Sequence, residues 1–228
     1  MSTLTSADLL SLAPVIPVVV FDEPAHATPL AQALLAGGVP IIEVTLRTPR
    51  ALDVIRAIRD TVPDAVVGAG TVTTPDLVRQ AVAAGAQFLV SPGTTGRLLA
   101  AMDDAGVPCL PGVASVSEVM CLLERGQREM KFFPAEAAGG PAFLNAIASP
   151  LPGARFCPTG GITSATAGRY RALDNVGCVG GSWLTPRDAL AARDWRRVEK
   201  LAAETTRTPG EPSLSTSSPA TSPSPAAV

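Results

Sequence analysis

Short apolar runs alternate with amphipathic segments along most of this chain. The apolar runs begin near residues 15, 40, 65, 86, 107, 128, 154 and 176. Between them lie segments such as 51–62, in which apolar residues recur every three or four positions and charged residues take the opposite face. This pattern predicts eight strands that alternate with helices.

Threonine–proline pairs mark three of the expected helix starts. Thr48-Pro49, Thr74-Pro75 and Thr185-Pro186 each place a hydroxyl before a proline. Proline is favoured at the first helical position, where its missing N–H is no loss, and threonine is a good N-cap. We therefore expect each of these threonines to cap the helix that follows it.

Eight strand–helix units are the number that an eight-stranded parallel (β/α)8 TIM barrel requires. The alternative is an open, doubly wound α/β sheet with a ligand crevice at its end. The barrel is favoured because the count is eight and because no G-x-G-x-x-G motif opens the first helix. We therefore expect an α/β barrel with an N-terminal helix over residues 1–206.

The last 22 residues, 207–228, have a different composition. They are rich in Pro, Ser and Thr, with one Leu and no aromatic residue. Such a segment cannot bury enough apolar surface to offset the entropy of ordering. We therefore expect a disordered tail.

Composition excludes several classes of function. The formal net charge of −2 gives no field for nucleic acid or for an anionic membrane surface. No run reaches the ~18 apolar residues of a membrane span, and the N-terminus lacks the basic segment of a signal peptide. These features predict a protein with no nucleic-acid or membrane partner.

The cysteines and the single histidine fit the same picture. The four cysteines, Cys109, Cys121, Cys157 and Cys178, form no C-x-x-C pair. Three of them lie in strand-like runs, which indicates buried, reduced thiols and a cytoplasmic location. The only histidine, His26, lies at an expected helix start. A metal site is not expected from this set.

Lysine is rare in this chain. Only Lys131 and Lys200 occur among 18 basic residues, and Lys131 lies in the short apolar strand-like run 129–134. Burial disfavours the charged ammonium, so we expect the pKa of Lys131 to fall towards neutrality. A neutral amine is nucleophilic and forms imines with carbonyl compounds, which makes Lys131 a candidate catalytic residue.

Side-chain alternation predicts what faces this amine. If Ile42, Val44 and Leu46 pack under helices, then Glu43 and Arg47 of the same strand point inward. The register that hides Met130 and Phe132 aims Lys131 inward as well.

Thr71 and Thr159, at the ends of the third and seventh strands, add hydroxyls to the same mouth. Arg47 would lower the pKa of Lys131 and Glu43 would raise it, and the sequence leaves this balance open. A purely structural ion pair of Glu43 with Lys131 or with Arg47 is the alternative, although such pairs stabilise proteins weakly.

Two glycine pairs follow the seventh and eighth expected strands. They are Gly160-Gly161 and Gly180-Gly181, the second followed by Ser182. Glycine lets the main chain approach a ligand closely, so its N–H groups can surround a phosphate. Because loops seven and eight are the usual phosphate site of this barrel, we expect these five residues to bind phosphate.

Six blocks of sequence resemble the class I 2-keto-3-deoxy-6-phosphogluconate (KDPG) aldolases, which also act on 4-hydroxy-2-oxoglutarate (KHG). The blocks lie in the family's order and spacing, and the resemblance covers about residues 8–205: EVTLRT (43–48), GAGTV (68–72), SPG (91–93), KFFPAE (131–136), PTGGI (158–162) and GGSWL (180–184).

The resemblance implies reversible cleavage of KDPG to pyruvate and glyceraldehyde 3-phosphate, the last step of the Entner–Doudoroff pathway. It implies a homotrimer and no cofactor or metal. It makes Lys131 the Schiff-base lysine and Glu43 the general acid/base. The remaining roles that it implies are pyruvate-carboxylate binding by Arg47 and Thr71, pocket lining by Pro92, Phe133 and Thr159, and phosphate binding by Gly160, Gly161 and Ser182.

Three other functions stay open from the sequence. The first is a related aldolase for the galactonate epimer or for unphosphorylated KHG. The second is a catalytically silent barrel that only binds a sugar phosphate. The third, a phosphosugar isomerase or epimerase, is disfavoured because the metal-dependent kind needs histidines that this chain lacks.

Overall fold

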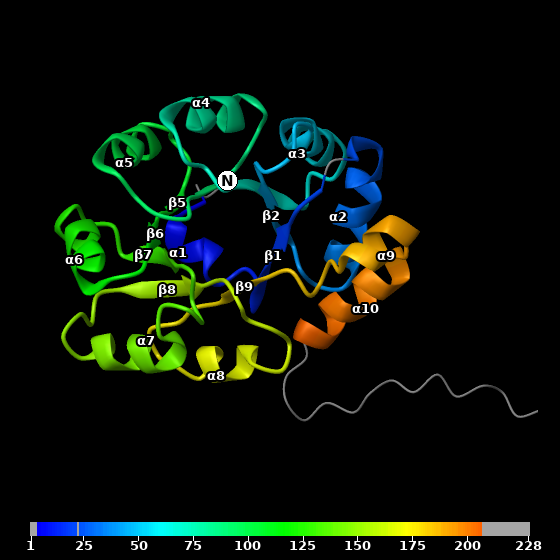
Figure 1. Cartoon of the computed structure of the whole chain (residues 1–228). Helices are drawn as coiled ribbons and strands as arrows, with labels where there is room; N and C mark the ends of the chain where they lie inside the picture. The colour runs from blue at the N-terminus through cyan, green and yellow to red at the C-terminus, as the bar shows by residue number, and fades with distance from the viewer. Residues whose placement is uncertain (1–3, 22, 207–228) are drawn as a thin grey trace, which may run out of the picture.

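Nine short strands, all paired in parallel, form the centre of the described part of the chain (Figure 1). The computed structural model describes residues 4–21 and 23–206, so the predicted tail 207–228 lies outside the described residues. The strands are β1 (Val15–Val19), β2 (Ile41–Thr45), β3 (Val66–Gly70), β4 (Leu89–Val90), β5 (Cys109–Leu110), β6 (Gly112–Val113), β7 (Glu129–Phe132), β8 (Arg155–Pro158) and β9 (Val179–Gly181).

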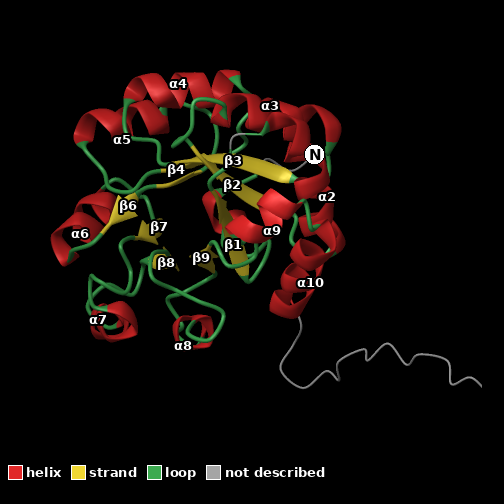
Figure 2. Ribbon diagram, turned by 45° about the vertical axis from the view of Figure 1, so that its right-hand side comes forward, coloured by secondary structure: helices red, strands yellow, loops and turns green. Residues whose placement is uncertain are grey.

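Helices surround the strands in Figure 1 and Figure 2, all on the outside except the short helix before β1, which lies inside the ring in Figure 1. Among the described residues they are α1 (Ser6–Leu9), the 3-10 turn η1 (Pro24–His26), α2 (Ala27–Ala36), α3 (Ala51–Thr61), α4 (Pro75–Ala83), α5 (Gly96–Asp103), α6 (Val116–Glu124), α7 (Gly140–Ala148), α8 (Ala167–Arg171), α9 (Arg187–Ala192) and α10 (Trp195–Thr206). None of them is long and apolar enough to cross a membrane.

The prediction of a closed eight-stranded (β/α)8 barrel is wrong. The strands form two sheets, a six-stranded one in the order β5-β4-β3-β2-β1-β9 and a three-stranded one in the order β6-β7-β8. The doubly wound alternative does not hold either, because the order runs sequentially from β5 back to β1 before it reaches β9.

Proline explains one of the two breaks between the sheets. The fifth apolar run yields two strands because Pro111 separates β5 from β6 and has no N–H to give to a ladder. β4 pairs with β5, whereas β7 pairs with β6. At the other break two isolated bridges replace a ladder: Phe156 of β8 pairs with Val176, which precedes β9, and Thr159, which follows β8, pairs with Gly180 of β9.

Helix α3 shows why the amphipathic segments fold as predicted. Val54, Ile55 and Ile58 are fully buried on one face. On the exposed face, Asp53 accepts hydrogen bonds from Arg50 Nε at 2.6 Å and Arg56 Nη1 at 2.8 Å. The apolar stripe fixes which side of the helix packs inward.

The prediction of threonine N-caps is confirmed at one of the three Thr-Pro pairs. Thr74 caps α4, since its hydroxyl accepts from the Leu77 N–H at 3.2 Å. The other two predictions are wrong because α3 begins at Ala51 and α9 at Arg187, beyond the Thr-Pro pairs. The Thr48 hydroxyl instead donates to the Phe21 carbonyl at 3.1 Å, which takes it away from the helix start.

Candidate active site

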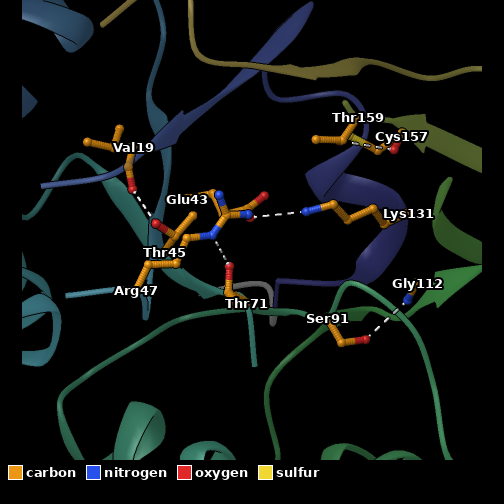
Figure 3. Close-up of polar contacts among 10 residues, drawn as sticks. All are labelled: Val19, Glu43, Thr45, Arg47, Thr71, Ser91, Gly112, Lys131, Cys157 and Thr159. Atoms are coloured by element: carbon orange, nitrogen blue, oxygen red, sulfur yellow. Dashed lines mark hydrogen bonds and ion pairs between the residues drawn. The ribbon is translucent and has the colours of Figure 1, made fainter. Parts of the chain in front are cut away.

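Lys131 lies at the third position of β7 and points into the molecule (Figure 3). Its backbone N–H donates to the Pro111 carbonyl at 3.0 Å, and Lys131 pairs with Gly112 on one side and Cys157 on the other. Met130 and Phe132 are fully buried on the opposite face. The predicted inward direction of Lys131 is confirmed, and only 3% of the residue is exposed.

Glu43 reaches the same place from β2. It is 2% exposed, and its Oε1 accepts a hydrogen bond from Lys131 Nζ at 3.3 Å (Figure 3). The same ammonium lies 5.3 Å from the centre of the Phe133 ring, a cation–π distance. An amine and a carboxylate with little access to water therefore share one contact beside an aromatic wall.

Gly70 leaves the space that the Glu43 carboxyl occupies. A Cβ atom on Gly70 would overlap Glu43 Oε1. β3 runs beside β2, with Thr45 paired to Gly70, so any side chain at residue 70 would enter the space of the Glu43 carboxyl. The position of Glu43 thus depends on its neighbour strand having no side chain there.

Arg47 and Thr71 meet at the end of β2 and β3. The Arg47 Nε–H donates to Thr71 Oγ1 at 3.0 Å (Figure 3), and the Arg47 side chain is exposed. Thr71 has φ 59°, the left-handed region that a threonine rarely adopts. Such backbone strain is typical of functional sites, and here it turns the Thr71 hydroxyl towards Arg47.

The two glycine loops line one cavity of about 200 Å³. Eight of the predicted site residues share it: Arg47, Phe133, Thr159, Gly160, Gly161, Gly180, Gly181 and Ser182. Gly160 and Gly161 have φ of 104° and 80°, which only glycine adopts readily. A Cβ on Gly180 would overlap the Thr159 hydroxyl, so this glycine lets β9 approach the end of β8.

Four predicted residues do not line this cavity: Lys131, Glu43, Thr71 and Pro92. Lys131 adjoins it through the Phe133 ring, which is a wall of the cavity, and Thr71 adjoins it through Arg47. Pro92 is half-buried in the loop after β4, where its main chain packs against Gly112, the strand neighbour of Lys131.

Sequence reasoning missed two sets of residues around the site. Val18 and Val20 line the cavity, and the alternation along β1 would have placed them on one inward face. Ser91 is fully buried, and its Oγ accepts from the Gly112 N–H at 3.1 Å. No local pattern marks Ser91, because its partner lies 21 residues away.

Two buried thiols, those of Cys109 and Cys178, have raised pKa values. Burial raises the pKa of Cys109 to about 12. A hydrogen bond to Cys157 and burial raise the pKa of Cys178. The prediction of buried thiols is confirmed for these two and for Cys157, while Cys121 is exposed on α6.

Comparison with known proteins identifies the family. The family model described as "KDPG and KHG aldolase" matches residues 7–201. This chain belongs to that aldolase family. The KHG/KDPG aldolase of Escherichia coli is 53% identical over 201 residues, covering 88% of this chain and 94% of the relative. The 2-dehydro-3-deoxy-phosphogluconate aldolase of Dickeya dadantii is 52% identical over the same shares of the two chains.

Two solved KDPG aldolases resemble the whole described fold. That of Legionella pneumophila, with pyruvate captured at low pH as a covalent carbinolamine intermediate, has a TM-score of 0.88 at 46% identity and covers 90% of this chain and 100% of its own. That of Zymomonas mobilis, with 3-phosphoglycerate, has a TM-score of 0.84 at 43% identity and covers 90% and 96%. The aldolase blocks of the sequence are therefore set in an aldolase fold.

Proposed function

We propose that this chain is a class I aldolase that cleaves KDPG reversibly into pyruvate and glyceraldehyde 3-phosphate in the Entner–Doudoroff pathway. The observation that carries the proposal is the buried Lys131–Glu43 contact of 3.3 Å, next to a cavity lined by two glycine loops. Family membership and the pyruvate carbinolamine of the Legionella relative support it.

Lys131 is the nucleophile in this proposal. Transfer of one proton from Lys131 Nζ to Glu43 Oε1 leaves a neutral amine beside a neutral carboxylic acid. The amine adds to the keto carbon and gives a carbinolamine. The Glu43 acid then gives its proton to the departing hydroxyl, so that water leaves and a protonated imine remains.

Glu43 next acts as a base. As the C3–C4 bond breaks, its carboxylate takes the proton of the C4 hydroxyl, the aldehyde departs, and the bonding electrons pass to the imine to give an enamine. Glu43 returns the proton to C3, and water releases pyruvate from Lys131. Each positioned proton transfer is worth roughly 10²–10⁴-fold in rate.

Arg47 and Thr71 hold the carboxylate of the keto acid. Arg47 uses its Nε for the Thr71 hydroxyl, and its terminal nitrogens make no hydrogen bond to other described residues. A guanidinium can grip a carboxylate with two parallel hydrogen bonds, which fixes the face of the ketone that meets Lys131.

The glycine loops take the phosphate. Gly160 and Gly161 take the left-handed conformation and line the cavity together with Ser182. In this proposal their main-chain N–H groups and the Ser182 hydroxyl donate to the phosphate. Phe133 and Thr159 line the space between phosphate and amine, and Pro92 supports Lys131 through Gly112.

Cleavage of KHG to pyruvate and glyoxylate is a second candidate activity of the same site. It is favoured by the 53% identity to the Escherichia coli KHG/KDPG aldolase. KHG leaves the glycine loops empty, so we expect a higher KM for KHG than for KDPG.

Family resemblance supports a homotrimer as a further part of the proposal, and the pattern of reduced cysteines supports a cytoplasmic location. Size-exclusion chromatography with light scattering tests the first, and fractionation of the native host cells tests the second.

Borohydride reduction with pyruvate present tests the imine. Lys200 gives a matched control because it is the other lysine of the chain. Peptide mapping should find the reduced adduct on Lys131 in the wild type and in Lys200→Arg, and no adduct in Lys131→Arg. An adduct on any other residue of the wild type would overturn the role of Lys131.

A further inference from the structure

A buried tyrosine from the helix after the first glycine loop reaches back towards that loop. Tyr170 lies on α8, which sits beside α7 below β8 in Figure 1. The residue is fully buried, and its hydroxyl donates to Glu136 Oε1 at 2.7 Å across 34 residues of sequence. A buried hydroxyl needs a partner, and Glu136 is the partner here.

Glu136 in turn supports the loop directly. Its backbone N–H donates to the Gly160 carbonyl at 3.1 Å. A Cβ on Gly161 would lie 2.8 Å from Glu136 Cβ and Cγ, so the stem of Glu136 packs against the Gly161 main chain. Glu136 therefore touches both glycines that take the left-handed conformation.

A third glycine, Gly140, lies against the side chains of both Tyr170 and Glu136. Gly140, with φ 58°, begins α7, and a Cβ there would lie 3.2 Å from the Tyr170 hydroxyl oxygen and 3.8 Å from Glu136 Oε2. The three segments that meet at this point are thus the first glycine loop, the start of α7 and helix α8.

The hydrogen bond from Tyr170 also affects the negative charge of Glu136 behind the loop. A free carboxylate behind a phosphate loop repels a phosphate dianion, and the Tyr170 hydroxyl both fixes Glu136 and withdraws charge from its Oε1. Burial and the hydrogen bond to Glu136 raise the pKa of Tyr170 above its ordinary 10.0, so the phenol remains a donor at neutral pH.

We infer that Tyr170 and Glu136 are positioning residues that hold the Gly160-Gly161 loop in its phosphate-binding conformation. This inference rests on the proposed function, because it assigns the affinity for the phosphate group and not the chemistry at Lys131. It makes Tyr170 and Glu136 determinants of the preference for phosphorylated substrates.

Tyr170→Phe tests the inference, since it keeps the ring and removes only the donor. Loss of a hydrogen bond to a charged group predicts a rise of about tenfold in KM for KDPG, with kcat unchanged. Exchange of pyruvate methyl protons in D₂O needs Lys131 and Glu43 but no phosphate, and should keep its wild-type rate. Binding of inorganic phosphate, measured by calorimetry, should weaken by about the same factor.

Variants of Glu136 sharpen the test. Glu136→Gln keeps an acceptor for Tyr170 but makes it neutral, so it should raise KM less than Tyr170→Phe does, whereas Glu136→Ala should match Tyr170→Phe. The double variant Tyr170→Phe with Glu136→Ala should lose no more than either single one. Thr61→Val, which removes the 2.6 Å hydroxyl bond to Ala57 on α3, is the control and should change neither constant.

Equal losses of KDPG turnover and pyruvate exchange in Tyr170→Phe, or unchanged phosphate binding, would overturn the inference. These outcomes differ from a failure of the proposed function. In that case the wild type itself would neither exchange pyruvate protons nor cleave KDPG, although phosphate binding would still separate the variants.

Discussion

At the scale of single residues, the site depends on side chains that are absent as much as on those present. Gly70 leaves the space that the Glu43 carboxyl fills, and Gly180 leaves the space of the Thr159 hydroxyl. With no side chain at residue 70, the Glu43 carboxyl has space to stand 3.3 Å from Lys131. Substitution of these glycines should therefore disturb catalysis before it disturbs the fold.

Gly70→Ala should displace the Glu43 carboxyl, because the added methyl would overlap Oε1. We expect kcat to fall by about 10²-fold from misplacement of a catalytic group and stability to fall by about 1–3 kcal/mol from overpacking. Steady-state kinetics and urea denaturation measure the two effects. Gly96→Ala is the control, since nothing lies within 4 Å of a Cβ there, and wild-type turnover in Gly70→Ala would contradict the reasoning.

Glu43→Gln should separate imine formation from proton transfer. The amide cannot exchange a proton with substrate, so we expect kcat for KDPG to fall by roughly 10²–10⁴-fold. Borohydride should still trap some pyruvate on Lys131. Glu199→Gln, an exposed change on α10, should keep full turnover, and full turnover in Glu43→Gln would exclude Glu43 as the acid/base.

At the scale of elements, strand alternation was enough to predict which way the candidate catalytic groups point. If Met130 and Phe132 face the helices from β7, Lys131 between them must point inward. Glu43 must point inward from β2 for the same reason. Helix starts were less predictable. A Thr-Pro pair is a local signal, and a tertiary contact such as Thr48 to Phe21 overrides it.

Thr74→Ala should remove the one Thr-Pro cap that the structure bears out. The Leu77 N–H would lose its partner at the start of α4, which costs about 1 kcal/mol. Urea denaturation measures the change. Thr73→Ala is the matched control, because the exposed Thr73 side chain makes no hydrogen bond within the described part of the chain, and equal losses in both variants would argue against the cap.

Some of the site lies beyond any reading of the sequence. Periodicity predicts direction along one strand, and loop glycines mark a close approach of the main chain. Neither tells which distant residue supports a loop, so Ser91 and the Tyr170–Glu136 contact went unpredicted. Counting apolar runs also could not show that Pro111 divides the fifth run between two sheets.

At the scale of the whole molecule, the buried centre protects three of the four cysteines. Because burial raises the pKa of Cys109 to about 12, above its ordinary 9.0, the folded chain keeps that thiol protonated after the unfolded chain has begun to ionise it. This contribution to stability is present below pH 9 and is lost as pH rises from 9 towards 12.

Iodoacetamide at pH 8 should therefore label the native protein on one thiol. We expect modification of Cys121, which is exposed, and protection of the other three. Peptide mass spectrometry identifies the sites, and the same reaction in urea should label all four. Labelling of Cys109 at the rate of Cys121 in the native state would contradict the burial argument.

The two members of the proposed catalytic pair belong to different sheets, Lys131 to the three-stranded one and Glu43 to the six-stranded one. No backbone ladder sets their separation, which is left to the fit of side chains across the gap between the sheets. A protein engineer who transplants this amine and acid into another scaffold must copy that interior fit. Two adjacent strands cut from the template would not bring the two groups together.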